Sequence, residues 1–519
     1  MNKISQILSP VVVYHPFLFA IFPVLFLFAH NIDECSFGEL PLPMAIVLGI
    51  TILLFYSLRL VFRDAQKAGL IASFLVIICL SYGQVARQII DWRINEIVLG
   101  RNRYLLSACL LLFLTLLWFV KRGKKSLNNI TKTLNFISII LLLITGGNLL
   151  FFFFREGKVA HRKPGNREDV IMHSESPDQL RDIYYIIFDR YAGDNTLRDV
   201  YHYDNKEFID YLTKKGFYVA RKSRANYNNT TQSLSSAFNL RYINDFFGNE
   251  NENSRNWRLY YPLLENFEVQ RFLKKKGYKY LHFGGLNDTT RKNPFADENY
   301  NLTVMSDLAL MIYQNSIIPL IPGVYKLFNP RHQQWERIRY QFKELARVPH
   351  RTEPTFTFAH FILPHPPFIF DRDGSFLPAA EASRRGKVEN YCNQLVYANS
   401  EIKKLVETIL IDSAIPPVII IQGDEGPWPQ RYEKDCNYFD WREATAAELQ
   451  EKFGILNAYY FPGDERPRFY PSITPVNSFR LIFNSLFKTR LPILPDKSYS
   501  ITDAQHPFRL FEVTKSLLE

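Results

Sequence analysis

The feature that most constrains this chain is a series of five strongly apolar runs within its first 154 residues. A helix that crosses a bilayer needs about 20 predominantly apolar residues. One such run could be a buried core helix, but five in succession with short polar loops between them predict transmembrane helices. The first run lacks a small-residue cleavage site and precedes further spans, so we do not interpret it as a signal peptide. The predicted spans are residues 11–29, 44–62, 68–85, 104–120 and 134–154.

Charges in the loops predict the orientation of these spans. The first loop, 30–43, has no Lys or Arg, whereas the fourth loop, 121–132, is rich in both. Because Lys and Arg favour cytoplasmic loops, the fourth loop and the N-terminus are expected inside. Four arginines in the third loop count against this orientation, but the fourth loop is denser in charge. The chain is therefore expected in the inner (plasma) membrane, multi-pass, with its C-terminal part on the periplasmic or extracellular side.

The rest of the chain has the composition of a globular protein. Residues 1–154 form the predicted membrane domain, 155–181 a polar linker and 182–519 one large exported domain. A hydrophobic content of 47% excludes a disordered chain, and 5 Cys exclude a disulfide framework. Cys392 and Cys436 could still pair, which their spacing does not decide.

The net charge of +11 raises the question of a nucleic-acid partner. No basic stripe interleaved with aromatic residues stands out, and an exported domain lies away from nucleic acid. We therefore expect no nucleic acid, and interpret the basic excess as a solvated surface or as attraction to anionic membrane lipids.

Strands and helices alternate in the exported domain, which predicts an α/β fold with a mostly parallel central sheet. Continuous apolar runs are typical of strands buried on both faces. The expected strands are 183–188, 278–283, 355–361 and 418–422, and the expected helices are 207–215, 263–275, 334–347 and 388–411. In such sheets the site lies beyond the carboxyl ends of the strands. Polar residues follow or end these strands: Asp189, His282, His360, His365, Asp424 and Glu425.

Asp189 and Asp424 each follow a buried strand. Either residue alone could be a turn former or a helix N-cap. Together they predict a site for a hard divalent cation such as Mg²⁺ or Mn²⁺, because carboxylates from separate strand ends can converge on one ion.

An Asn-Asn-Thr-Thr run at residues 228–231 precedes a helical stretch of small and apolar residues. Taken alone it is an N-cap cluster. In the functional interpretation, Thr230 or Thr231 stands at a helix N-terminus, where free amides stabilise a phosphate or sulfate. A metal-bound threonine hydroxyl there could act as a nucleophile.

His360 and His365 lie five residues apart in a proline-rich segment. This is not the spacing of a zinc-binding helix, and either histidine could be structural. An imidazole beside a phosphoryl group would suit substrate binding or proton transfer to the leaving oxygen.

The order of strand and Asp189, Asn-Thr-Thr before a helix, His-Pro-Pro-Phe, and then Val-Ile-Ile-Ile-Gln-Gly-Asp-Glu-Gly resembles the alkaline phosphatase superfamily. The chain is most similar to its sulfatase-like branch, which includes lipoteichoic acid synthases and phosphoethanolamine transferases. That branch also carries about five spans before an exported catalytic domain. The resemblance implies Thr230 as the nucleophile and His365, with His360 and Asn229, as substrate-binding residues. It implies one metal ion held by four residues: Asp189, Thr230, Asp424 and Glu425.

The chain departs from the family pattern at Glu425, where the family has histidine in Asp-His-Gly. A glutamate ligand would make an all-oxygen shell, which favours Mn²⁺ or Mg²⁺ over Zn²⁺.

The sequence therefore predicts a membrane-anchored phosphoryl-group transferase that moves a phospholipid head group onto a cell-envelope glycan or lipid acceptor. Two alternatives stay open: a phosphoester or sulfate-ester hydrolase of the same fold, and a catalytically decayed membrane scaffold. Residues 308–327 are apolar and broken by two prolines. They could be a core insertion or an interfacial patch beside the bilayer.

Overall fold

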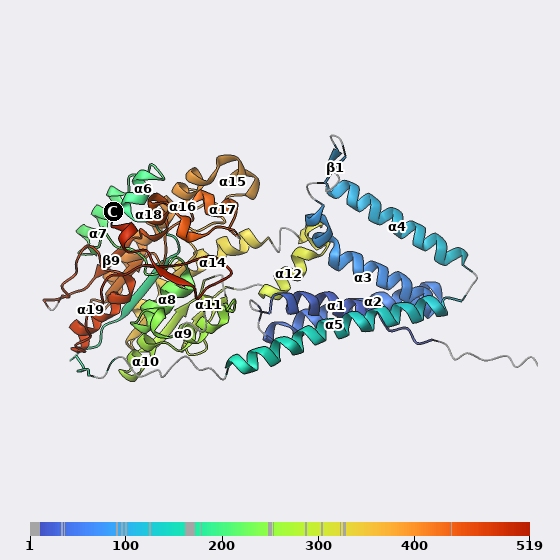
Figure 1. Cartoon of the computed structure of the whole chain (residues 1–519), viewed down its shortest axis with the longest axis horizontal. Helices are drawn as coiled ribbons and strands as arrows, with labels where there is room; N and C mark the ends of the chain where they lie inside the picture. Colours follow the sequence, from blue (N-terminus) through green and yellow to red (C-terminus); the bar gives the residue numbers. More distant parts are fainter. Residues whose placement is uncertain are drawn as a thin grey trace, which may run out of the picture. The chain divides into compact units, whose positions relative to one another are not determined.

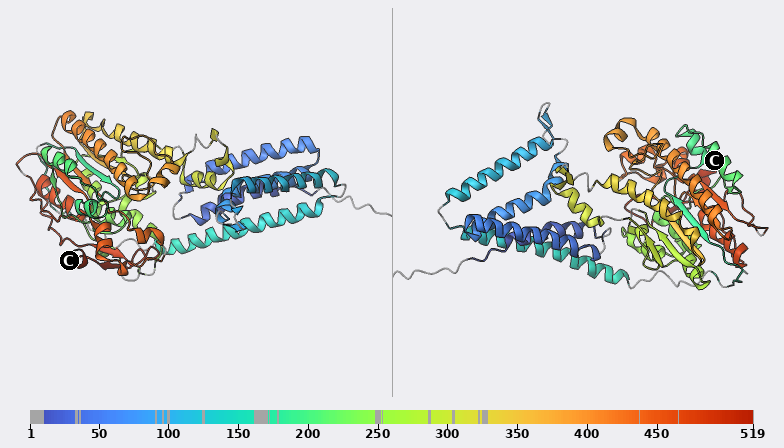
Figure 2. Two further views of the ribbon diagram at one scale, coloured as in Figure 1. Left: turned by 90° about the horizontal axis from the view of Figure 1, so that it is seen from above. Right: turned by 180° about the vertical axis from the view of Figure 1, so that it is seen from behind.

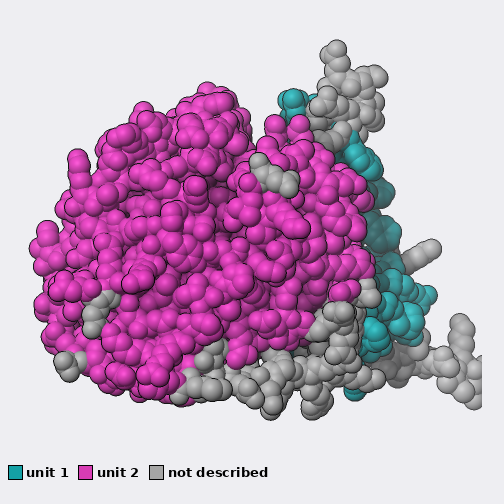
Figure 3. All heavy atoms as spheres, turned by 60° about the vertical axis from the view of Figure 1, so that its left-hand side comes forward, with its two compact units in different colours: residues 1–162, 304–330 teal, residues 163–303, 331–519 magenta. Residues whose placement is uncertain are grey.

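The computed structural model describes most of the 519 residues in two compact units, which Figure 3 colours separately. The helical unit contains residues 1–162 and 304–330, and the sheet unit contains residues 163–303 and 331–519. The described residues are 11–32, 35, 37–89, 92–94, 97–98, 101–123, 126–160, 171, 173–177, 179–247, 252, 254–285, 288–302, 305–321, 323–324, 329–436, 438–464 and 466–518.

The helical unit places a helix at each of the five predicted spans (Figures 1 and 2). They are α1 His15–His30, α2 Pro41–Phe62, α3 Ala65–Gln88, α4 Asn102–Arg122 and α5 Asn128–Ala160. Within the described residues, four segments are long and apolar enough to cross a membrane, and α1 is a shorter apolar helix of 16 residues. Large apolar side chains such as Leu53 and Leu60 are more than 70% exposed. Helices with this outer surface need an apolar solvent, as in a bilayer.

Residues 304–330 leave the sheet unit and belong to the helical unit. Here α12, Asp307–Asn315, buries Leu308 and Ile312 against Val24 and Phe28 of α1. The Arg87 guanidinium of α3 donates a hydrogen bond to the Gln314 carbonyl over 3.1 Å, and Ile317 N–H donates to the Cys79 carbonyl over 2.8 Å. The described part of the apolar segment 308–327 is thus packed against predicted membrane spans.

The sheet unit is built on a mixed sheet of which most neighbouring strands are parallel, as predicted. In the described residues its strand order is β4-β9-β8-β3-β7-β5-β6. The run from β8 to β6 is parallel, and β9 and β4 continue it antiparallel at one edge. The strands are β3 Ile183–Phe188, β4 Tyr218–Val219, β5 Lys279–Phe283, β6 Glu298–Tyr300, β7 Thr355–Phe361, β8 Val418–Gln422 and β9 Asn457–Tyr460.

Helices cover both faces of this sheet, which explains why its central strands are apolar throughout. All six residues of β3 are buried, and they alternate between the two faces. One face packs against α7 Lys206–Lys214, α14 Pro330–Leu345 and α16 Lys387–Asp412. The other packs against α8 Thr230–Asn239, α10 Glu268–Lys275 and α19 Pro475–Phe487. A site is therefore expected at the carboxyl ends of the parallel strands.

The structure differs from the prediction at the expected helix 263–275. Two helices stand there, α9 Tyr261–Glu265 and α10, separated at Asn266 and Phe267. Phe267 has an extended backbone, and its buried ring stacks on Phe238 with centroids 4.0 Å apart. Core packing therefore overrides local helix propensity at this point.

Cys392 and Cys436 are free thiols. The disulfide that their presence in one domain allowed does not form in this structure.

Candidate metal centre and active site

Three predicted site residues meet at the carboxyl ends of β3, β7 and β8. Asp189 directly follows β3, His360 lies near the end of β7, and Asp424 comes two residues after β8. The parallel register pairs Ile187 with both His360 and Gln422, so the three strand ends lie at one level. One ligand atom from each residue lies within 4.8 Å of the others. We call Asp189, His360 and Asp424 the Asp-His-Asp cluster.

This cluster is almost wholly buried yet keeps polar atoms unsatisfied. Asp189, His360 and Asp424 are 2%, 0% and 2% exposed. Among the described residues, none hydrogen-bonds to Asp189 Oδ1, His360 Nε2 or Asp424 Oδ2. Buried polar groups are rarely left unpaired, so three such atoms together fit the ligand set of a cation. Two carboxylates and an imidazole are usual ligands of divalent ions.

A second layer of hydrogen bonds fixes the ring of His360. Its Nδ1 lies 2.9 Å from the Thr290 hydroxyl, which turns Nε2 toward the carboxylates. Gly285 permits this packing, because a Cβ there would come within 2.8 Å of His360 Nδ1. The Thr290 carbonyl in turn lies 2.8 Å from Nε2 of His282. His282 is therefore a supporting residue, and burial lowers its pKa to about 4.

The two carboxylates of the cluster have opposite pKa shifts. Burial, Asp189 and Glu425 raise the pKa of Asp424 to about 7. Burial also raises the pKa of Asp189, but His365, His360 and Arg190 outweigh it and hold that pKa well below its ordinary value. Asp424 is thus a buried carboxylate with two other carboxylates beside it, an arrangement that fits a bound cation.

Thr230 is the first residue of α8 and lies beside the cluster. Its hydroxyl is near enough to Asp424 to lower the pKa of that carboxyl. The side-chain oxygen of Asn229 caps the helix by accepting a hydrogen bond from Thr231 N–H over 3.0 Å. Thr230 itself is half-buried.

His365 lies on the loop that follows β7 and is half-buried. The loop is tied to α16 by Gln394, which donates to the His365 carbonyl over 2.9 Å and accepts from Ile369 N–H over 2.9 Å. Burial lowers the pKa of His365 to about 4, although Asp189 opposes that shift. The predicted substrate-binding histidine is therefore an electrostatic neighbour of the cluster.

Glu425 lies in a different environment from Asp424. Its Oε1 accepts from Lys452 Nζ at 2.8 Å and from Arg190 Nε at 3.3 Å. Its Oε2 is buried, and no described residue hydrogen-bonds to it, so its role as a metal ligand stays a prediction. Glu425, Lys452, Arg190 and the neighbouring Trp428 form what we call the Glu425 cluster.

The sequence analysis did not single out Arg190 or Lys452. Arg190 could have been noticed, because it directly follows Asp189. Lys452 stands 26 residues beyond Gly426, in α18 Ala446–Phe453, and nothing in the local sequence links it to the site.

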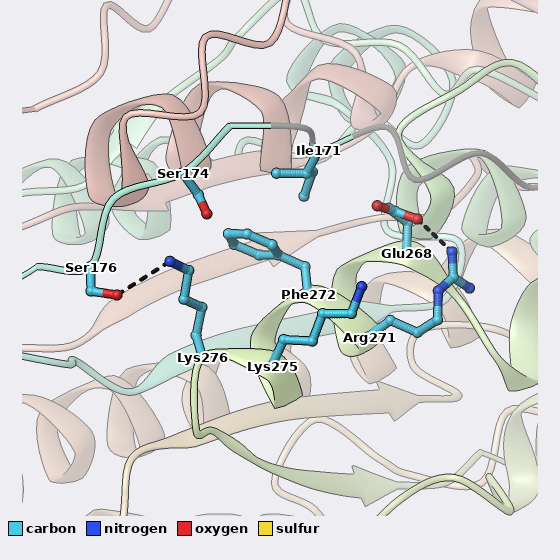
Figure 4. Close-up of a pocket in the computed structure, with 8 residues that line it drawn as sticks. All are labelled: Ile171, Ser174, Ser176, Glu268, Arg271, Phe272, Lys275 and Lys276. Carbon is cyan, nitrogen blue, oxygen red and sulfur yellow. Dashed lines mark hydrogen bonds and ion pairs between the residues drawn. The ribbon is translucent and has the colours of Figure 1, made fainter.

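Two cavities of the sheet unit lie apart from these clusters. One, of about 370 Å³, lies between residues 171–176 and α10 and is lined by basic side chains such as Lys275 and Lys276 (Figure 4). The other is a groove of about 1000 Å³ between α14 and α16. Neither is lined by a residue of the Asp-His-Asp cluster.

Most of the sheet unit matches the sequence profile of a known protein family. The sequence profile described as Sulfatase matches residues 182–471, more than half of the chain. No curated protein matches.

Solved structures similar to this chain share little of its sequence. The C-terminal periplasmic domain of EcEptC from Escherichia coli is 14% identical, with a TM-score of 0.41, covering 66% of this chain and 94% of its own. Lipooligosaccharide phosphoethanolamine transferase A from Neisseria meningitidis, an integral membrane protein, is 10% identical with a TM-score of 0.38. That match covers 92% of this chain and 96% of the other. The periplasmic domain of phosphoethanolamine transferase EptC from Campylobacter jejuni is 12% identical with a TM-score of 0.38, covering 65% and 98%.

The extent of the profile match decides the classification. It begins at the strand that carries Asp189 and includes Thr230, both histidines, Asp424 and Glu425. The chain therefore belongs to the sulfatase family, and most of its sheet unit lies within the part that the profile matches.

Proposed function

We propose that this protein is a membrane-anchored, metal-dependent phosphoryl-group transferase with Thr230 as its nucleophile. It would move the head group of a phospholipid onto a glycan or lipid acceptor of the cell envelope. The observation that carries the proposal is the position of Thr230. Thr230 is the half-buried first residue of α8, and its hydroxyl is near enough to Asp424 of the Asp-His-Asp cluster to lower the pKa of that carboxyl.

Asp189, His360 and Asp424, with the Thr230 hydroxyl, would hold one divalent cation. An all-oxygen shell that includes Glu425 would favour Mn²⁺ or Mg²⁺. The imidazole of His360 makes the described set mixed, which suits Mn²⁺ better than Mg²⁺ and makes Zn²⁺ the rival to test. When bound, the cation supplies positive charge for the transferring group and lowers the pKa of a coordinated hydroxyl.

The side chains of the site would divide the reaction between them. Thr230 Oγ1 forms a bond to phosphorus while the bond from phosphorus to the glycerol oxygen of the lipid breaks. The free amides at the N-terminus of α8 stabilise the phosphoryl oxygens. An acceptor hydroxyl then attacks the same phosphorus and releases Thr230. The proton that Thr230 loses in the first step goes to the departing glycerol oxygen, and the proton of the acceptor hydroxyl returns to Thr230 Oγ1 in the second. His365, beside the cluster, is placed to hydrogen-bond a reacting oxygen.

The apolar helices support a lipid donor. An enzyme for soluble esters would gain little from several membrane-spanning helices, whereas a lipid substrate is presented at the bilayer itself. The loop charges support a site on the periplasmic or extracellular side, where envelope glycans occur. Nucleic acid is not an expected partner.

Hydrolysis is the second candidate, with water in place of the acceptor hydroxyl. Membership of the sulfatase family favours it, because that family is named for ester hydrolysis. Sulfate esters are less favoured. The family resemblance implies that sulfatases use a formylglycine made from Cys or Ser, which Thr230 cannot form.

The test uses the full-length protein in vesicles whose phospholipid carries a labelled head group. We expect the Thr230→Ala variant to lose about 10³-fold or more in activity while its thermal unfolding is unchanged. Thr230→Ser, which keeps the hydroxyl, is the matched variant and should retain measurable activity. Labelled glycan or lipid product supports transfer, and labelled water-soluble product alone supports hydrolysis. Wild-type turnover by Thr230→Ala would reject the nucleophile.

A further inference from the structure

The Glu425 cluster contains two cations beside one carboxylate, and both lie near the proposed substrate site. Lys452 is fully buried, and its ammonium lies 3.4 Å from the centroid of the Trp428 ring. It also donates a hydrogen bond to the Gly426 carbonyl over 3.0 Å. One buried cation already neutralises the charge of Glu425, so Arg190 adds a further positive charge.

The Arg190 guanidinium is held in one orientation by two contacts. Its Nε lies 3.3 Å from Glu425 Oε1, and its Cζ lies 4.7 Å from the centroid of Trp428. A planar guanidinium fixed at Nε and on one face retains its two Nη groups as a fork. No described residue hydrogen-bonds to those Nη atoms, and the side chain remains 11% exposed.

A structural arginine elsewhere in the same unit behaves differently. Arg480 is 4% exposed and uses all three nitrogens on backbone carbonyls. Its Nε and Nη2 donate to the Leu240 carbonyl, and its Nη1 donates to the Pro492 carbonyl over 2.6 Å. A buried arginine of this unit can thus have all its nitrogens hydrogen-bonded, whereas no described residue hydrogen-bonds to the Nη groups of Arg190.

The backbone at Arg190 also departs from the ordinary. Its φ of 60° lies in the left-handed region, which is uncommon for a residue with a side chain. The turn is closed by the Tyr191 N–H, which donates to the Phe188 carbonyl over 3.1 Å. The Tyr391 hydroxyl donates to the Arg190 carbonyl over 2.8 Å. Strained residues that the surrounding structure holds in place cluster at functional sites.

Arg190 also borders the Asp-His-Asp cluster. Its backbone N–H lies 3.4 Å from Asp424 Oδ1, and Arg190 directly follows Asp189 in the sequence. Its positive charge also helps to lower the pKa of His365, the predicted substrate-binding histidine.

We propose that Arg190 binds the tetrahedral anionic group of the substrate through its free Nη fork, and that Glu425 is its positioning residue. This rests on the proposed function, since it names the recognition element for the phosphate of that same site. Two parallel N–H donors match two oxygens of a phosphate. Glu425, with its charge balanced by Lys452, keeps the guanidinium plane aimed at them.

The test measures binding of inorganic phosphate to the full-length, Mn²⁺-loaded wild type by titration calorimetry. Arg190→Gln should weaken phosphate binding about 10- to 100-fold, as expected for loss of a charged bidentate contact. Arg190→Lys keeps the charge without the fork, so its phosphate affinity should lie between those of the wild type and Arg190→Gln. Arg198→Gln is the matched control, because Arg198 is exposed and paired with Asp199. Phosphate affinity of Arg190→Gln equal to that of the wild type would overturn the proposal.

The positioning role of Glu425 is tested with a double-mutant cycle on phosphate affinity. Glu425→Gln should weaken binding in the wild type but have little further effect in the Arg190→Gln variant. Additive losses would overturn the role of Glu425. Metal content and thermal unfolding are measured for each variant, so that loss of the ion or of the fold is recognised. These readouts need no turnover. A failure of Thr230 as nucleophile would therefore leave them intact, and a failure of Arg190 would leave the nucleophile intact.

Discussion

The Asp-His-Asp cluster and the Glu425 cluster lie side by side at the carboxyl end of β8, and both are buried. They differ in how their charges are compensated. Glu425 has a cation from each of two elements, Lys452 and Arg190, within 3.3 Å. Asp424, its neighbour in the sequence, has an unpaired oxygen and a pKa raised to about 7 by burial and by the other carboxylates. The two adjacent carboxylates therefore differ: Glu425 is paired with cations of the chain, whereas Asp424 keeps an oxygen to which no described residue hydrogen-bonds.

Burial also perturbs the counter-ion of Glu425. It lowers the pKa of Lys452 to about 8, although Glu425 favours the charged form. A buried ion pair of this kind contributes little net stability compared with apolar side chains, but breaking it is costly. We therefore regard Lys452 as support for a functional carboxylate and guanidinium rather than as a source of fold stability.

The largest expected effect of a substitution is a loss of stability at Lys452. Lys452→Met leaves Glu425 without its closest cation and should lower the free energy of unfolding by about 3–5 kcal/mol. Denaturant unfolding of the full-length protein in detergent measures this loss. Lys434→Met, at an exposed position, is the matched control. A Lys452→Met variant as stable as the wild type would show that Glu425 is not held as a buried ion.

A smaller but selective effect is expected at Asp424. Asp424→Asn removes one charged ligand of the Asp-His-Asp cluster and should weaken Mn²⁺ affinity about 100-fold. Metal titration of the purified protein measures the change, with Asp435→Asn as an exposed control. Equal affinity in Asp424→Asn and the wild type would place the ion elsewhere.

The smallest effect on the metal is expected at Glu425. Glu425→Gln should change Mn²⁺ affinity by less than about 3-fold, because the described contacts of Glu425 are to cations of the chain. The same titration distinguishes this from direct ligation. A loss comparable with that of Asp424→Asn would establish Glu425 as a ligand, as the family resemblance implies.

Much of the fold could be predicted because its strands are buried on both faces. The strands 183–188, 355–361 and 418–422 are confirmed residue for residue. The five apolar runs of the first 154 residues are also confirmed as helices. The break at Phe267 could not be predicted, because it depends on a ring from another helix.

The candidate site was predictable only where its residues stand in local motifs. Thr230 and Asp424 stand beside cap and turn signals, and in the structure the Thr230 hydroxyl is near enough to lower the pKa of Asp424. The resemblance implies His360 as a substrate-binding residue, which stays a prediction. The orientation of its Nε2 toward the carboxylates depends on Thr290, 70 residues away. Lys452 and the packing of residues 304–330 on the apolar helices depend on tertiary contacts that no sequence motif records.

The central claim is that the Asp-His-Asp cluster and Thr230 hold one catalytic cation. A crystal structure of the Mn²⁺-loaded protein, with anomalous scattering to locate the ion, tests it most directly. We expect one Mn²⁺ ion within coordination distance of Asp189, His360 and Asp424, with the Thr230 hydroxyl beside it. An ion bound elsewhere, or a cluster that remains without metal at saturating Mn²⁺ and Zn²⁺, would contradict this account.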